Sequence, residues 1–446
     1  MWELFSSGLL SVWLDAVGVE TTVTDAWDRF SGAATPGLAV VGTKEPAIDA
    51  IVQNYLQQLT AKGLLREEQG IWIQTGYQLL TSNQGTTPMP AASLTKVATS
   101  LAALSAWELD HQFETLVGTS GTVVDGVLQG DLVVTGGGDP LFVWEDAISL
   151  GLNLQQLGIR RISGNLVIAG NFTMNYQPDS RASGELLRLA WNEAKWTEDV
   201  ARAHSRLGGN KPNLEVTGQV VVAAAPTEPK LLVRHLSLPL AQILKRMNVY
   251  SNNFIAETLA DGLGGAQVVR TSAAKAALVP VAEILLVNGS GLGVDNRISP
   301  RAACAMFMAI QRYLLDKRDS GGGVYTIGDL FPISGRDRGT LEERRVPKGA
   351  TVKTGSLWNV SGLAGALPTE KGLIWFAIVN GGDYLEGFRA AQDDLLHQFV
   401  KEWGARAELP SILTPQAKPQ PQLRPGEKTG GRGDQETGGP GDGGTG

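Results

Sequence analysis

The stretch 91–98 constrains this chain more than any other, because it places a serine and a lysine at the start of a buried helix. It follows Pro88 and Pro90, and its apolar residues recur at the intervals of a helix with one face in a core. Ser93 and Lys96 are three residues apart and share a helix face. Free backbone N–H groups at a helix start favour a developing anion. The stretch therefore predicts a serine nucleophile with a lysine as its proton acceptor.

The Ser-x-x-Lys pair is not specific by itself. About one or two copies are expected by chance at ordinary serine and lysine usage in a chain of this length. The chain holds a second copy, formed by Ser272 and Lys275. A lone copy is more typical of a helix N-cap followed by a solvated lysine, so the hypothesis needs support from elsewhere in the sequence.

Composition excludes several classes of function. The 446 residues carry 38 basic and 45 acidic side chains, for a net charge of −7, which disfavours a nucleic-acid-binding protein. The single cysteine, Cys304, excludes an internal disulfide framework and a thiolate zinc cluster. The four histidines show no metal-ligand spacing, and no partner for Ser-His-Asp chemistry stands out. We expect neither a metal nor a cofactor.

The amino terminus predicts a helix that packs on the main body. Trp2, Phe5, Leu9 and Trp13 recur at helical spacing, and no lysine or arginine precedes the apolar run 8–14 as a secretory signal would require. No segment reaches the ~20 apolar residues of a membrane span. We therefore expect no transmembrane span.

Periodicity predicts a sheet covered by helices. A helix is expected over about 46–62 and another over 385–403, where apolar residues form one stripe. The run 372–380 is nearly all apolar and should be a central strand. The other expected strands are 71–75, 78–81, 350–356 and 362–367, and the other expected helices are 239–247, 251–259 and 298–315.

Between these elements lies a region of short strands. A hairpin with an Asp-Gly turn is expected over 122–128, and further strands over 131–135, 165–170 and 219–223. The glycine run 136–138 lacks dinucleotide-binding spacing. We therefore divide the chain into an N-terminal helix and connector (1–44), a discontinuous catalytic domain (45–117 and 232–405), an inserted strand-rich domain (118–231) and a disordered tail (406–446).

Three short motifs occur in a fixed order: Ser93-x-x-Lys96, Ser251-x-Asn253 and Lys353-Thr-Gly. Each is expected in a suitable context, namely a helix start, a loop between helices and a strand. Decoys exist, but Ser163-Gly-Asn lies in the inserted region, and the Lys-Thr-Gly copy at 428–430 lies in the tail.

With this set, the chain resembles the class C, low-molecular-mass penicillin-binding proteins, the D-alanyl-D-alanine carboxypeptidase/endopeptidase family. The segments 136–141, 288–292, 296–300 and 353–357 are also similar to patterns of that family, and the resemblance covers about 45–405. It implies an α/β fold of the β-lactamase/transpeptidase type, an antiparallel sheet covered by helices, with the inserted strand-rich domain. The interval between the first two motifs is short, and Val294 stands where a basic residue is common.

The resemblance implies a serine-type peptidase mechanism. Ser93 attacks the penultimate D-alanine and forms an acyl-enzyme, and Lys96 accepts its proton. Burial and the charge of Lys353 are expected to lower the Lys96 pKa. Ser251 relays a proton to the leaving group, and Asn253 holds Lys96 and the substrate amide.

The resemblance also implies the substrate-binding residues. Lys353 and Thr354 are expected to bind the terminal carboxylate, and the backbone N–H groups of Ser93 and Ser356 to form the oxyanion hole. Gly355 and Leu357 of the same strand are expected to line the site. Asp139 of the inserted domain is expected to meet the amine of a diamino-acid side chain, with a simple Asp-Pro turn as the alternative.

The implied substrates are peptidoglycan peptides, and the implied inhibitors are β-lactams that bind covalently. A periplasmic location follows from such substrates rather than from the amino terminus. Two alternatives stay open from the residues alone. One is a β-lactamase or esterase of the same fold, which hydrolyses its acyl-enzyme quickly. The other is a non-catalytic wall-binding protein.

Overall fold

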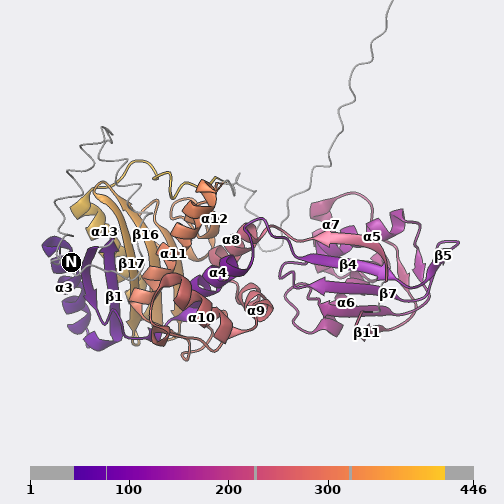
Figure 1. Cartoon of the computed structure of the whole chain (residues 1–446), viewed down its shortest axis with the longest axis horizontal. Helices are drawn as coiled ribbons and strands as arrows, with labels where there is room; N and C mark the ends of the chain where they lie inside the picture. The colour runs from indigo at the N-terminus through magenta and orange to yellow at the C-terminus, as the bar shows by residue number, and fades with distance from the viewer. Residues whose placement is uncertain (1–44, 77, 226–228, 321–323, 417–446) are drawn as a thin grey trace, which may run out of the picture. The chain divides into compact units, whose positions relative to one another are not determined.

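The computed structural model describes residues 45–76, 78–225, 229–320 and 324–416 (Figure 1). The described chain forms two compact units, one of residues 45–112 and 238–416 and the other of residues 113–237. Each unit is treated by itself below. The expected N-terminal helix and the carboxyl-terminal residues 417–446 lie outside the described residues.

A five-stranded antiparallel sheet forms the centre of the first unit. Its strands run in the order β15-β16-β17-β1-β2. Their bounds are β1 (Gln69–Thr75), β2 (Gln78–Asn83), β15 (Thr351–Leu357), β16 (Val360–Thr369) and β17 (Gly372–Gly381). β17 is the middle strand and is mostly buried, as its apolar run predicts. β15 is an edge strand, so every second backbone N–H group along it faces away from β16.

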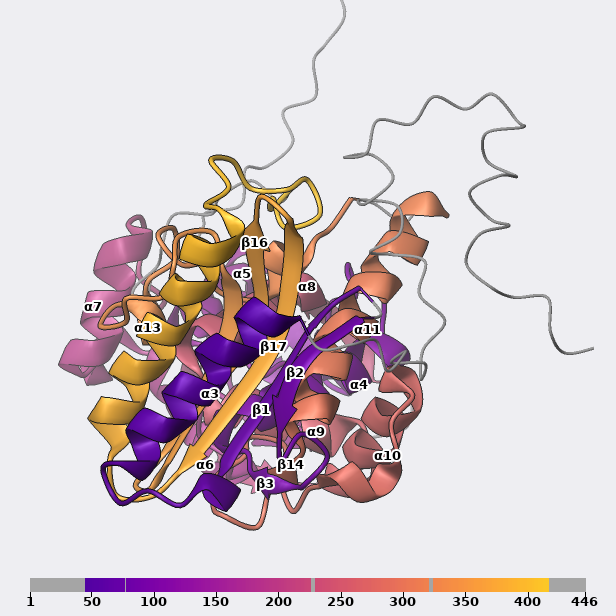
Figure 2. The ribbon, with the colours of Figure 1, turned by 90° about the vertical axis from the view of Figure 1, so that its left-hand side faces the viewer.

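Helices cover both faces of this sheet. α3 (Pro46–Thr60) and α13 (Leu385–Trp403) lie side by side over one face (Figure 2). Both bury an apolar stripe there, against residues such as Ile71 and Ile73 of β1. α11 (Pro300–Asp319) packs on the other face, where Gln74 of β1 contacts Met308. The α/β fold with a helix-covered antiparallel sheet, as expected from the sequence, is therefore confirmed.

Shorter elements complete the first unit. They are η1 (Arg66–Glu68), β3 (Met89–Pro90), η2 (Ala92–Leu94), α4 (Thr95–Ala106), α8 (Leu240–Tyr250), α9 (Asn253–Gly262), α10 (Ala266–Ala277), η4 (Val281–Glu283), β13 (Ile284–Leu285), β14 (Arg297–Ile298), α12 (Ile327–Leu330) and η5 (Gly339–Leu341). α4 is buried along most of its length. No helix within the described residues is both long enough and apolar enough to cross a membrane.

The second unit contains two sheets, in the orders β11-β9-β7-β4-β12 and β10-β8-β6-β5. The strands are β4 (Glu114–Thr119), β5 (Thr122–Val124), β6 (Val127–Gln129), β7 (Leu132–Gly137), β8 (Arg161–Ile162), β9 (Leu166–Asn171), β10 (Glu215–Val216), β11 (Val220–Val222) and β12 (Lys230–Leu236). The β5–β6 hairpin turns at Asp125 and Gly126, both with positive φ, as the Asp-Gly signal predicts.

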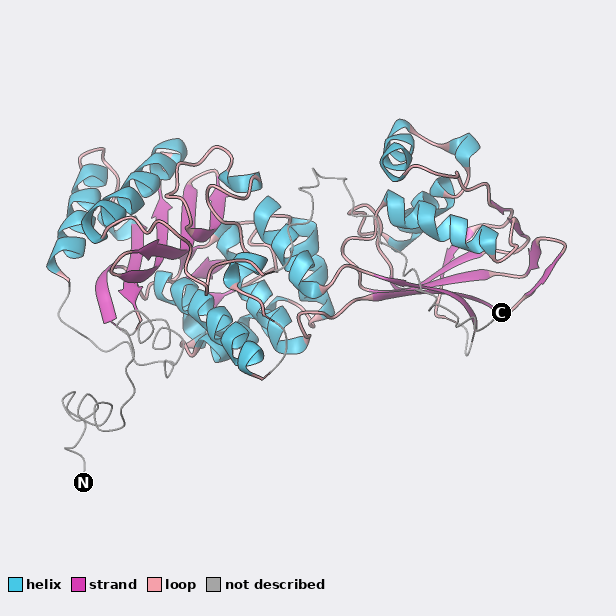
Figure 3. Ribbon diagram, turned by 90° about the horizontal axis from the view of Figure 1, so that it is seen from above, coloured by secondary structure: helices cyan, strands magenta, loops and turns pink. Residues whose placement is uncertain are grey.

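The second unit also contains helices that the strand-rich description omitted. They are α5 (Trp144–Gln156), α6 (Ser180–Ala190), η3 (Glu193–Lys195) and α7 (Glu198–Leu207). The helices lie on one side of the larger sheet in Figure 3. Buried residues of α5, α6 and the strands form one hydrophobic core.

The boundary of the predicted tail is wrong by several residues. Leu413 is fully buried, and the backbone N–H of Gln416 donates to the carboxylate of Asp329. A carbon added at Gly328 would meet the Leu413 backbone oxygen at 2.3 Å, so this segment lies directly on α12. The segment 406–416 therefore belongs to the first unit, because Ile412 and Leu413 can bury apolar surface that the average composition of the tail conceals.

Candidate active site

The nucleophile predicted from the sequence lies in a tight turn rather than in the first turn of an α-helix. Ser93 is in the 3-10 turn η2, and α4 begins two residues later at Thr95. Ala92, immediately before it, has a φ of 48°, a left-handed conformation that non-glycine residues seldom adopt. Such strained residues cluster at functional sites because the surrounding structure must enforce them.

Lys96 connects this turn to two other segments of the first unit. Its Nζ atom donates to Ser93 Oγ at 3.0 Å, to Asn253 Oδ1 at 2.8 Å and to the Ser290 backbone oxygen at 2.7 Å. The side chain is fully buried. Burial lowers the Lys96 pKa to about 7, although the nearby Glu257 carboxylate acts in the opposite direction. A substantial share of the amine is therefore neutral near pH 7 and can accept a proton.

Ser251 and Asn253 lie between two helices, as the sequence predicts. Ser251 ends α8 with a φ of 52°, and the Asn252 side chain caps α9 by accepting from the Ile255 N–H. The chain therefore turns sharply at Ser251. Asn253 then begins α9 with its amide oxygen on Lys96.

Lys353 completes the cluster from β15. Its Nζ atom donates to Ser251 Oγ at 3.0 Å and to the Thr354 backbone oxygen at 2.7 Å. The side chain is fully buried, and burial together with the charge of Lys96 holds the Lys353 pKa well below its usual value. The structure thus brings together all five residues that the three motifs nominate as catalytic.

Side chains alternate between the two faces of β15, so the residues of the third motif point in two opposite directions. Ser356 pairs with Ser361 of β16, and the Ser361 hydroxyl and carbonyl bond to Gln392 of α13. Paired residues on antiparallel strands point to the same face, so Ser356 and Thr354 face α13. Lys353 and Gly355 face the opposite way, toward η2 and the loop after α8.

Gly355 lets β15 approach the nucleophile turn closely. A carbon added at Gly355 would lie 3.1 Å from the Ser93 nitrogen and 3.0 Å from the Ala91 backbone oxygen. A similar approach occurs at Gly291, where φ is 85° and an added carbon would overlap the Ala92 carbonyl. Both glycines therefore fix the position of the turn that carries Ser93.

Two residues of the site received no role from the sequence. Ser290 supplies the carbonyl for Lys96, although the segment 288–292 was noted for its pattern. Glu257 accepts from the backbone N–H groups of Gly289 and Ser290, at 2.9 and 3.0 Å, and so holds that loop. Glu257 follows Asn253 by one helical turn, and that spacing was the available signal.

A cavity of about 530 Å³ opens beside the cluster. Ser93, Ser251, Thr354 and Ser356 line one side of it. The remaining lining residues, called the second wall below, come from the segment 339–345 and from α13, where they are Glu386, Arg389, Ala390 and Asp393. None of these second-wall residues was predicted from the sequence.

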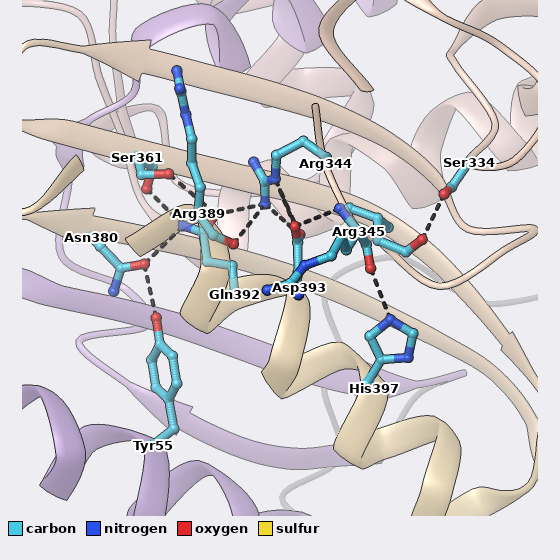
Figure 4. Close-up of polar contacts among 11 residues, drawn as sticks. Tyr55, Ser334, Arg344, Arg345, Ser361, Asn380, Arg389, Gln392, Asp393 and His397 are labelled. Carbon is cyan, nitrogen blue, oxygen red and sulfur yellow. Dashed lines mark hydrogen bonds and ion pairs between the residues drawn. The ribbon is translucent and has the colours of Figure 1, made fainter. Parts of the chain in front are cut away.

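A buried ion pair holds the second wall in place. The Arg344 guanidinium bonds to Asp393 at 2.7 Å, and both side chains are almost fully buried (Figure 4). Gln392, beside Asp393, accepts from Arg344 and donates to Asn380 of β17. The Asn380 amide oxygen in turn accepts from the Tyr55 hydroxyl of α3. This network ties the loop 339–345 to α13, the sheet and α3.

Some residues that the sequence suggested for the site, and the second Ser-x-x-Lys pair, lie outside the cluster around Ser93. Asp139 belongs to the second unit, where its carboxylate is almost fully buried and accepts from the Leu141 N–H at 2.8 Å. Burial raises the Asp139 pKa, and His235 Nε2 lies 3.8 Å away. Ser272 lies in the middle of α10, and Lys275 lies in its last turn. Leu357 ends β15 and is half-buried.

The described residues contain no group of histidine, cysteine, aspartate and glutamate side chains arranged to hold a metal ion. What the site offers instead is a hydroxyl on an amine of lowered pKa, a second hydroxyl on a second buried amine, and an edge strand. These groups suit acyl transfer through a serine ester.

This fold and cluster define a low-molecular-mass penicillin-binding protein. The profile of the D-Ala-D-Ala carboxypeptidase 3 (S13) family matches residues 52–183 and 201–400, and the chain belongs to that family. The resemblance found in the sequence is thereby confirmed, and the protein is a serine-type hydrolase of the carboxypeptidase/endopeptidase group.

Individual relatives agree with this assignment. The D-alanyl-D-alanine carboxypeptidase DacB of Haemophilus influenzae is 25% identical over 405 residues, which cover 68% of this chain and 83% of that protein. Two solved structures share the fold. The predatory peptidoglycan endopeptidase Bd3459 of Bdellovibrio bacteriovorus has a TM-score of 0.63 at 20% identity, covering 79% of this chain and 97% of that one. Penicillin-binding protein 4 of H. influenzae has a TM-score of 0.59 at 22% identity, covering 78% and 98%.

Proposed function

We propose that the chain hydrolyses D-alanyl peptide bonds of peptidoglycan stem peptides through an acyl-enzyme on Ser93. The observation that carries the proposal is the contact of Lys96 Nζ with Ser93 Oγ at 3.0 Å, in a site where burial lowers the lysine pKa to about 7. A neutral amine at that distance can take the hydroxyl proton as the oxygen attacks.

The first step forms the bond between Ser93 Oγ and the carbonyl carbon of the penultimate D-alanine, and the proton moves to Lys96. The oxyanion is held by the backbone N–H groups of Ser93 and Ser356. The carbon–nitrogen bond then breaks, and Ser251 relays the proton held by Lys96 to the leaving amine, so that Lys96 is neutral again and Ser251 keeps its hydroxyl. Lys353, which contacts Ser251 Oγ, holds that hydroxyl in place. Water finally releases the acyl group and restores Ser93.

Asn253 positions Lys96 through its amide oxygen and presents its amide nitrogen to the substrate. Thr354, Gly355, Ser356 and Leu357 bind the substrate along the edge strand β15. Asp139 has a structural alternative to a substrate role, since its buried carboxylate already caps the turn at Leu141. We favour that alternative for Asp139.

Either of two leaving groups fits this chemistry. A terminal D-alanine gives a carboxypeptidase, and an amino group that carries a cross-link gives an endopeptidase. The curated relative is named as a carboxypeptidase and the Bdellovibrio structure as an endopeptidase. Peptidoglycan as the substrate places the protein in the periplasm, and β-lactams should acylate the same serine.

Covalent labelling with a fluorescent penicillin tests the nucleophile and its base. Ser93→Ala should abolish labelling, and Lys96→Ala should reduce it almost as far, because knockouts within one catalytic unit each cost on the order of 10⁶ in rate and do not add. Lys96→Arg should also fail, since a guanidinium keeps its proton.

The matched controls are Ser272→Ala and Lys275→Ala, which alter the same Ser-x-x-Lys spacing within α10. Both should label like the parent. Labelling that persists in folded Ser93→Ala, or that maps to another serine, would refute the proposal. Mass spectrometry of products from cross-linked and uncross-linked muropeptides then separates endopeptidase from carboxypeptidase activity. The deacylation rate separates both from a β-lactamase.

A further inference from the structure

The candidate active site contains a cation that its three motifs do not supply. A carboxypeptidase must recognise the carboxylate beside the scissile amide, and a positive charge is the ordinary means of doing so. Lys353 was the expected cation. Its Nζ atom is instead fully buried and directed at Ser251 Oγ and the Thr354 carbonyl. Burial and the charge of Lys96 also hold its pKa well below the usual value, which disfavours its charged form.

Arg389 lies on the other side of the same cavity. It belongs to α13, on the helix face that lines the cavity, one turn before Asp393. Its Nη2 atom donates to Ser356 Oγ at 2.9 Å. Ser356 and Thr354 face α13, and both line the same cavity as Arg389. A planar guanidinium also matches the geometry of a carboxylate.

The two carboxylates of α13 on this wall, Glu386 and Asp393, do not cancel the positive charge of Arg389. Asp393 is engaged by Arg344 in a buried pair, and the Arg389 side chain extends away from that pair in Figure 4. Arg389 does bond to Glu386, but the Glu386 side chain is 80% exposed. Exposed pairs contribute little, because water screens them and each partner remains free to exchange.

We propose that Arg389 is a specificity-determining residue that binds the carboxylate on the leaving group of the substrate, together with the hydroxyls of Thr354 and Ser356. The Ser356 hydroxyl anchors one edge of the guanidinium, and its remaining N–H groups can bind both carboxylate oxygens. The inference rests on the proposed function, since it concerns the substrate of the same site.

The binding role follows from the position of Ser356 relative to Ser93. The two residues line one cavity, and a carbon added at the neighbouring Gly355 would lie 3.1 Å from the Ser93 nitrogen. The leaving carboxylate is attached one carbon away from the scissile nitrogen. It must therefore lie close to Ser356 while Ser93 attacks, and the Arg389 guanidinium is hydrogen-bonded to Ser356.

The test compares two substrates that differ only in this charge. One is an acylated tripeptide ending in D-alanyl-D-alanine, and the other ends in D-alaninamide. We expect the parent to prefer the free acid. Arg389→Gln should lower kcat/KM for the acid about 10- to 100-fold, the loss expected for a charged hydrogen bond, and should leave the amide nearly unchanged. Arg389→Lys keeps the charge without the planar guanidinium. Its kcat/KM for the acid should fall between those of the parent and of Arg389→Gln.

Arg345→Gln is the matched control, because it removes a second guanidinium that lines the same cavity. It should leave the acid-to-amide ratio as in the parent. Circular dichroism and thermal melting check that each variant is folded. An unchanged ratio in Arg389→Gln, or an equal loss on both substrates, would overturn the assignment and give Arg389 a purely structural role. A parent that cleaves neither peptide, with no label on Ser93, would instead refute the proposed function and the carboxylate site with it.

Discussion

Glu257→Gln should shift the pH dependence of acylation to lower pH. The carboxylate of Glu257 accepts from two backbone N–H groups of the loop that holds Lys96, and its negative charge raises the Lys96 pKa. Glutamine keeps one acceptor oxygen but removes the charge. The Lys96 pKa should therefore fall further, and the neutral, proton-accepting amine should persist into more acidic solution.

The pH dependence of the parent's acylation rate gives the expected size of the change. With a Lys96 pKa of about 7, half of the amine is neutral at pH 7. By the same titration roughly a tenth is neutral at pH 6 and about nine tenths at pH 8. The acylation rate should thus fall about fivefold between pH 7 and pH 6. If Glu257→Gln displaces the acidic limb of this pH–rate profile by one unit, the relative rate at pH 6 should rise about fivefold.

The assay is the second-order rate of penicillin acylation, measured from pH 5.5 to 9 and normalised to the alkaline plateau of each variant. Normalisation is needed because a looser 288–292 loop would lower the plateau rate of acylation without moving the acidic limb of the pH–rate profile. Asp261→Asn is the control, since it removes a negative charge one turn further along α9, where the residue has no contribution to the Lys96 pKa. Its profile should match the parent.

Two results would refute this reasoning. A parent profile that stays flat from pH 5.5 to 8.5 would show that Lys96 does not titrate as the acylating base. The acidic limb of the pH–rate profile could also move to higher pH in Glu257→Gln, or move equally in Asp261→Asn. Either result would show that the charge of Glu257 does not act on Lys96.

Three further predictions follow from single contacts. Gly355→Ala should slow penicillin acylation strongly in a folded protein, measured by labelling kinetics and melting, because its carbon would press on the Ser93 nitrogen and push β15 away. Leu413→Ala should destabilise the first unit by about 2–5 kcal/mol in denaturant unfolding, as expected for a fully buried leucine, while the folded protein labels normally. Asp139→Ala should lower thermal stability and leave penicillin labelling of the folded fraction intact, since the carboxylate caps the Leu141 N–H; a selective loss of diamino-acid peptide turnover at full stability would restore its substrate role.

The helices and strands of the first unit could be predicted closely because each has a clear local sequence pattern. The apolar run of β17 has no polar interruption, and the stripe of α13 keeps helical spacing over the whole range that was predicted. The positions of the motif residues were also predictable, since they lie in the turn that leads into α4, at a helix junction and in a strand. Local sequence determines those contexts, so the positions of these residues could be predicted before their contacts were visible.

The helices of the second unit were missed for a tertiary reason. Gly151 in the middle of α5 counts against a helix when it is judged by propensity. In the structure a carbon at Gly151 would lie 2.5 Å from the Trp191 ring, so the glycine is there to let α5 pack closely. Nothing near Gly151 in the sequence indicates that Trp191 will approach it.

The second wall of the cavity was missed for the same reason. Arg344 and Asp393 are 49 residues apart and become partners only when α13 lies on the sheet. Arg389 has no motif around it, and its relation to Ser356 depends on the face to which β15 turns that residue. Local patterns identify groups that react, whereas these binding groups are defined by how distant elements pack.

The separation of bases and binding cation has a chemical consequence. A carboxylate that bound directly to Lys353 would stabilise the protonated forms of Lys96 and Lys353 and so raise both pKa values. Substrate binding would then leave less neutral amine to accept a proton. The alternation of β15 avoids this, because Lys353 faces Ser251 while Thr354 and Ser356 face α13. With Arg389 as the binding cation, the substrate charge is neutralised on the far face of the strand. Lys96 then keeps its pKa of about 7, and the same substrate can be both recognised by its charge and attacked by a neutral base.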